Sequence, residues 1–127
     1  MPHRAVRNLL GLLAVCFPLL APAATPTRAD TEIRALMTEV GQSGCRFQRN
    51  GRWHEAFQAQ AHLQRKYDWA VRKGLAGSAE DFITRAASGS SLTGRAYRIA
   101  CPGQSEVEAG DWFSQRLARL RAHTTPR

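Results

Sequence analysis

The chain has 127 residues and a formal net charge of +8, with 18 basic residues against 10 acidic ones. This length is enough for one hydrophobic core but not for several. The basic balance favours anionic surfaces, such as lipid headgroups, acidic glycans or acidic proteins, and does not by itself indicate a specific site.

The first 23 residues are typical of a secretory signal peptide. Two arginines and no acidic residue precede an apolar run of 12 residues, 9–20, and Ala21-Pro22-Ala23 follows with the small residues of a cleavage site. The run is shorter than the roughly 20 residues that span a bilayer. We therefore expect cleavage near Ala23 and no permanent membrane anchor. Lipidation at Cys16 is a weaker alternative, because Val15 stands where a lipoprotein signal has a small residue.

Export would leave one small domain, residues 24–127, with an ordered part of about 30–122. The signal peptide removes two arginines, so the formal charge becomes 8 − 2 = +6. High basicity often indicates nucleic-acid binding, but an exported, periplasmic or secreted chain rarely meets nucleic acid. The expected partners are an envelope protein or an anionic envelope surface.

Two cysteines, Cys45 and Cys101, remain after cleavage. In an oxidising compartment a single pair of cysteines most simply forms one disulfide. The closed loop would hold about 57 residues, which the chain-entropy treatment values at about 4 kcal/mol.

The predicted elements begin with a helix over 31–41, capped by Asp30 or Thr31, whose apolar residues recur at helical spacing. Cys45 and Phe47 alternate with polar residues, which indicates a strand. Asn50-Gly51 predicts a type I′ hairpin turn, because both residue types accept a positive φ.

Further helices are predicted over 53–73, 79–87 and 109–122. The first of these ends at Gly74, and Ser78 to Asp81 resembles a capping box. A Ser/Gly/Thr loop over 88–96 leads to a strand over 97–101. The apolar face of the long helix is expected to cover the strands; it comprises Ala56, Ala59, Leu63, Tyr67, Ala70 and Val71.

The predicted fold class is therefore α+β and mostly helical. About four helices surround a small antiparallel patch, made of a hairpin and a further strand and stapled by one disulfide. Three short strands need a helix over one face to be stable, and the long helix supplies it.

The sequence shows no complete catalytic or metal-binding motif. Neither HExxH nor CxxC occurs, so we expect no metal and no cofactor. Ser90 and Ser91 lie in a hydroxyl-rich loop, with Lys66 or His62 as conceivable bases, but neither GxSxG nor SxxK is present. No facing carboxylate pair suggests a glycosidase. An enzyme is thus the less favoured interpretation.

A row of side chains lies on the nominally polar side of the long helix. His62, Lys66 and Trp69 stand at i, i+4 and i+7. A Trp beside a cation and a His forms a plausible ligand patch if it is exposed. The alternative is that a second layer of structure covers Trp69.

The segments CRFQRNGRW, AHLQRKY, AEDFI and SSLTGRAYRIAC, in this order behind a signal peptide, resemble the YfeK-like family of small periplasmic proteins with a domain of unknown function. The resemblance covers residues 32–121. It implies export and makes the two cysteines a family feature, but it implies no activity, cofactor or catalytic residue. Thr93 stands where the family pattern has a serine, which keeps the hydroxyl.

The leading hypothesis is a non-enzymatic binding or interaction module of the cell envelope. Its candidate binding residues are His62, Lys66, Trp69, Ser90, Ser91, Thr93, Gly94 and Arg49. One alternative is an envelope hydrolase that uses Ser91 with Lys66 or His62. Another is an accessory protein that binds anionic lipid or glycan through its basic surface.

Overall fold

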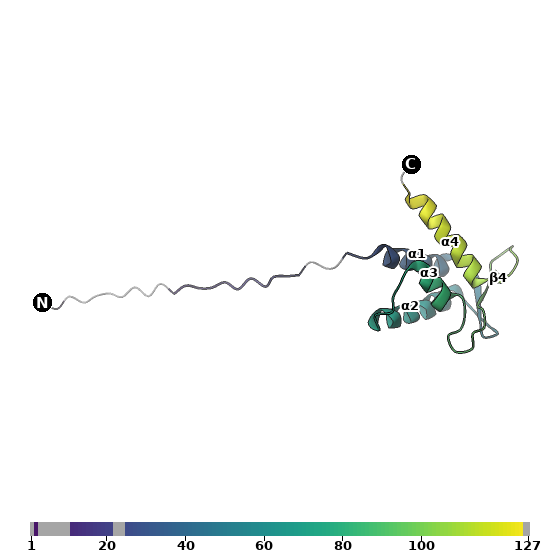
Figure 1. The fold of residues 1–127 in the computed structure, drawn as a ribbon, viewed down its shortest axis with the longest axis horizontal. Coiled ribbons are helices and arrows are strands. Elements are labelled where there is room, and N and C mark those ends of the chain that lie inside the picture. Colours follow the sequence, from purple (N-terminus) through teal and green to yellow (C-terminus); the bar gives the residue numbers. More distant parts are fainter. Residues whose placement is uncertain (1, 3–10, 22–24, 126–127) are drawn as a thin grey trace.

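The computed structural model describes residues 2, 11–21 and 25–125. The basic start of the predicted signal peptide, in 3–10, and its cleavage site, in 22–24, lie outside the described residues. Residues 11–21 form no helix or strand and extend away from the folded part (Figure 1), with their large apolar side chains exposed. Regular structure runs from Arg28 to Thr124.

Helix α1 spans Arg28–Gln42. It begins earlier than predicted, because Thr27 is the N-cap and its Oγ1 accepts a hydrogen bond from the backbone N–H of Asp30 at 3.0 Å. The predicted inward residues are confirmed as buried. They are Ile33, Leu36, Met37 and Val40.

Strands β1 (Arg46–Arg49) and β2 (Arg52–His54) form the predicted hairpin. Asn50 has φ 49° and Gly51 has φ 79°, so both turn residues take the positive φ that a type I′ turn requires. The hairpin prediction is confirmed.

The sheet has four antiparallel strands in the order β2-β1-β3-β4. Strand β3 spans Arg98–Ala100 and β4 spans Val107–Glu108. Strand β4 was not predicted, because it is two residues long with both side chains exposed, and so it has no alternating pattern. The strands gather at the end of the domain opposite the N-terminal segment (Figure 1).

Helix α2 spans Ala56–Arg72. It starts later than predicted, because the chain is still in β2 at Trp53 and His54. It ends as predicted: the N–H of Leu75 donates to the carbonyl of Ala70 at 2.8 Å, and Gly74 has φ 68°. The inward assignment of Val71 is wrong, because residues 71–78 are all exposed and the last turn projects beyond the core.

The predicted helix over 79–87 is confirmed in two parts. Helix α3 (Ala79–Phe82) begins with the expected capping box between Ser78 and Asp81 and continues as a π-helix, η1 (Ile83–Ala87). The last helix, α4 (Ala109–Thr124), buries Trp112, Phe113 and Leu117. The core lies where α1 packs against α2, and where α4 packs against η1, α1 and the sheet.

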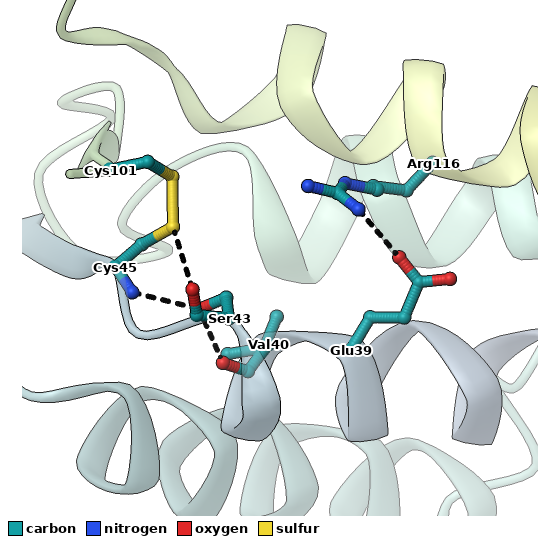
Figure 2. Close-up of a disulfide and its surroundings, with 6 residues drawn as sticks. All are labelled: Glu39, Val40, Ser43, Cys45, Cys101 and Arg116. Carbon is teal, nitrogen blue, oxygen red and sulfur yellow. Dashed lines mark hydrogen bonds and ion pairs between the residues drawn. A yellow bond between two sulfur atoms is a disulfide. The ribbon is translucent and has the colours of Figure 1, made fainter. Parts of the chain in front are cut away.

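The disulfide between Cys45 and Cys101 is confirmed, with Cα atoms 4.2 Å apart. It joins the residue before β1 to the residue after β3. Figure 2 shows the bridge beside the end of α1, where Ser43 Oγ accepts from the Cys45 N–H at 3.1 Å and donates to the Val40 carbonyl at 2.7 Å. The fold is therefore α+β, mostly helical and joined by one disulfide, as predicted.

Candidate functional site

Two clefts adjoin α2. The larger has a volume of about 580 Å³ and the smaller about 320 Å³. Four residues line both clefts and so form the wall between them. They are Arg49, His62, Arg65 and Tyr97.

The register of the sheet explains why Arg49 meets Tyr97. Strands β1 and β3 pair Phe47 with Ile99 and Gln48 with Arg98. One further step in the same register places Arg49 opposite Tyr97, and Arg49 shares the inward face of Phe47 because side chains two apart on a strand point the same way. Arg49 therefore stands at the end of the strand, where the apolar core gives way to the clefts.

His62 of α2 connects these two residues. Arg49 Nη1 lies 2.7 Å from His62 Nδ1, and His62 Nε2 lies 3.3 Å from the Tyr97 hydroxyl oxygen. A guanidinium can only donate, and Nη1 lies closer to Nδ1 than to Nε2, which is 3.3 Å away, so we assign Nδ1 as the unprotonated, accepting nitrogen. Nε2 then carries the proton and donates it to Tyr97.

Lys66, one turn further along α2, points at oxygen atoms. Its Nζ lies 2.8 Å from the Ala86 carbonyl, 3.4 Å from the Gly89 carbonyl and 3.4 Å from the Tyr97 hydroxyl. Its three N–H groups are thus all directed at acceptors. Lys66 ties the end of η1 to α2, a structural role that the sequence did not reveal.

Burial and neighbouring cations keep His62 neutral. Desolvation, followed by the positive charges of Arg49 and Lys66, lowers the pKa of His62 to about 4. Desolvation also lowers the pKa of Lys66 and raises that of Tyr97. The histidine therefore serves as a hydrogen-bonding link at neutral pH and not as a charge.

Counting donors and acceptors leaves Tyr97 with a free proton. With this tautomer its hydroxyl oxygen accepts from His62 and from Lys66, and the described residues place no other hydrogen-bond partner at the hydroxyl. Arg49 likewise uses only Nη1, toward His62, in the part of the chain that the structure describes. The cluster of Arg49, His62, Lys66 and Tyr97 therefore has N–H and O–H donors without a partner and lacks an acceptor for them.

The loop after η1 braces this cluster. Ser90 is buried, and its Oγ accepts from the N–H groups of Leu92 and Thr93 at 3.3 Å each and from Asn50 Nδ2 at 3.4 Å. Thr93 Oγ1 donates to Asn50 Oδ1 at 2.8 Å. Asn50 therefore fastens the hairpin turn to the loop, so Ser90 and Thr93 have structural contacts that explain their residue types.

The structure brings six of the eight candidate binding residues to the larger cleft. They are Arg49, His62, Lys66, Trp69, Ser90 and Ser91. Thr93 and Gly94 line neither cleft. Sequence reasoning missed Tyr97 as a site residue; its inward position in the alternating strand was the only available signal.

Trp69 is 51% exposed on the wall of the larger cleft, so no second layer covers it. Leu75, at 54%, and Leu92, at 95%, line the same cleft. Large apolar side chains that stay exposed beside a cleft are typical of binding surfaces.

No hydrogen bond joins Ser91 to Lys66 or His62 within residues 25–125. In the same residues, no group of three potential metal ligands comes together. Within the described chain, no helix is both long enough and apolar enough to cross a membrane.

Comparison with known proteins places the sequence in a family. The sequence model of a family of unknown function, DUF5329, matches residues 27–121. The chain therefore belongs to this family. No curated protein and no solved structure is significantly similar to it.

Proposed function

We propose that this protein is an exported, non-enzymatic binding module of the cell envelope, and that its larger cleft receives an anionic group. The observation that carries the proposal is the donor-rich cluster of Arg49, His62, Lys66 and Tyr97. A carboxylate or phosphate oxygen accepts hydrogen bonds and carries the charge that such a cluster favours.

The charge around the cleft supports an anion over a cation. Four basic residues line the larger cleft, namely Arg49, Arg65, Lys66 and Arg85, against one acidic residue, Asp81. Asp81 already accepts from the Ser78 N–H at 3.1 Å and lies 3.9 Å from Arg85. A cleft with positive walls concentrates anions near its surface.

A titration with acetate and with inorganic phosphate tests this proposal. At constant ionic strength, set with chloride, we expect saturable NMR shifts of Tyr97 and of the Arg49 side chain. Tyr97→Phe keeps the buried ring but removes the free O–H. Losing one hydrogen bond to a charged group should weaken binding about tenfold.

Arg49→Gln should weaken the same titration by a similar factor. The matched control is Arg52→Gln, which removes one positive charge from the same hairpin at an exposed position that lines neither cleft. If the control weakens binding as much as Arg49→Gln, the effect is one of net charge and the cluster is not a site.

Export rests on the N-terminal sequence and on the disulfide. Disulfides persist in oxidising compartments, and the apolar residues of 11–21 contribute no side chain to the core. N-terminal sequencing of the protein, produced with its full leader in a bacterial host, should give a chain that starts near Ala24. A protein that keeps Met1 and stays in the cytoplasm would contradict export.

Two alternatives remain as predictions. The first is a hydrolase that uses Ser91 with Lys66 or His62; labelling by a fluorophosphonate, lost in Ser91→Ala, would favour it. The second is an accessory protein that contacts anionic lipid or glycan through its basic surface.

The assignment to the YfeK-like family stays a prediction that rests on the resemblance of the sequence.

A further inference from the structure

The larger cleft has a polar end and an apolar end. His62, Lys66 and Trp69 follow one another on the cleft side of α2. At a rise of 1.5 Å per residue, Trp69 stands about 10 Å along the helix from His62. The free donors of Arg49 and Tyr97 therefore lie at one end, and the indole of Trp69 lies toward the other.

Beyond Lys66 the wall is mostly apolar and partly unprotected, and its charged members Asp81 and Arg85 lie 3.9 Å apart as an ion pair. Core side chains, namely Ile33, Tyr67 and Phe82, form part of its lining, together with Ala70 and Ala76. Six large apolar side chains are exposed within residues 25–125, and three of them line this cleft. These three are Trp69, Leu75 and Leu92. Leu92 belongs to the Ser90 loop that Asn50 holds, so it borders the polar end of the cleft.

From this arrangement we propose that the larger cleft binds a single-chain amphiphile with an acidic head, such as a fatty acid. The head accepts hydrogen bonds from Tyr97 and Arg49, and the alkyl chain passes Leu92 and runs on toward Trp69 and Leu75. The proposal rests on the proposed function, because it names the ligand class of the same site. Charge complementarity selects the acidic head, and the apolar wall selects the chain.

A flat membrane surface fits the site less well. The O–H donor of Tyr97 belongs to a residue that is only 7% exposed, so a head group must enter the cleft to reach it. A single amphiphile can enter head first, whereas the packed headgroups of a bilayer stay on the outside.

Calorimetric titration with dodecanoate, kept below its micelle-forming concentration, tests the proposal. We expect dodecanoate to bind at least tenfold more tightly than acetate, because the chain buries apolar surface. Dodecyl phosphate in a parallel titration compares the two acidic heads. Dodecyltrimethylammonium, with the same chain and a cationic head, should not bind.

The double variant Leu75→Ser with Leu92→Ser removes apolar wall without touching the core. It should weaken dodecanoate binding about tenfold and leave acetate binding unchanged. The matched control is Val71→Ser, which changes a side chain that is 50% exposed on α2, close to Leu75 in sequence, and lines neither cleft. A blue shift of tryptophan emission on binding, absent in Trp69→Phe, would locate the chain.

Each remaining outcome overturns the proposal in a distinguishable way. If dodecanoate binds no more tightly than acetate, the alkyl chain of the ligand has no binding site, and the anion proposal survives. If neither binds, both proposals fail. If vesicles of anionic phospholipid retain the protein while monomeric dodecanoate does not bind, the apolar wall is a membrane contact. If Val71→Ser weakens binding as much as the double variant, the wall is not specific.

Discussion

Removing the disulfide between Cys45 and Cys101 is expected to lower the free energy of unfolding by about 4 kcal/mol. The bridge spans a sequence separation of 56, and the loop that it closes contains β1, β2, α2, α3, η1 and β3. Without the bridge the unfolded chain gains conformational freedom. Urea denaturation of the wild type and of Cys45→Ala with Cys101→Ala measures the difference.

In protein that keeps its leader, Cys16→Ser provides the control, because Cys16 is a free, exposed cysteine outside the folded part. It should leave the free energy of unfolding unchanged. If the double variant loses less than about 1 kcal/mol, the bridge does not act by constraining the unfolded chain.

The bridge also fixes the strand register on which the site depends. One step from the pair Arg46 and Ala100 places Cys45 opposite Cys101, in the register that places Arg49 opposite Tyr97 at the other end.

The second large effect is a loss of stability in mild acid caused by His62. Its pKa is about 4 in the folded protein, below the usual 6.5, because of desolvation and the charges of Arg49, Lys66, Arg65 and His54. Between these two values the unfolded chain binds a proton that the folded chain does not. Stability from this group is therefore complete above pH 6.5 and is lost as the pH falls toward 4.

Between pH 7 and pH 5 we expect His62 to cost about 1–2 kcal/mol of unfolding free energy, a figure reduced for the solvent that reaches its half-buried ring. Urea denaturation at the two pH values checks it. His62→Gln keeps an amide donor toward Tyr97 and should lose less stability over this range. His123→Gln, on the exposed end of α4, should behave like the wild type; equal losses in all three proteins would exclude His62 as the cause.

The helix ends and the hairpin were largely predictable, because their signals are local. Asn50-Gly51 specifies its turn through two backbone angles, and Ser78 with Asp81 caps α3 through atoms three residues apart. Where another local signal competed, the prediction missed. Thr27 capped α1 ahead of Asp30, and β2 kept Trp53 and His54 out of α2.

The site was predictable only in part. Helical spacing placed His62, Lys66 and Trp69 in one row, and all three line the larger cleft. Spacing could not show that Lys66 binds the carbonyls of η1, nor that Tyr97 holds a free hydroxyl proton. Those contacts join residues 20 and more positions apart.

The sequence by itself determined the class of fold, the pairing of Cys45 with Cys101 and the residues of its turns. These properties follow from short-range periodicity, from caps and from counting cysteines. Only the tertiary structure decided that Arg49 meets His62 and Tyr97, and that Trp69 stays exposed above a cleft. The register of β1 against β3 and the packing of α2 depend on long-range contacts, and no local pattern in the chain encodes these.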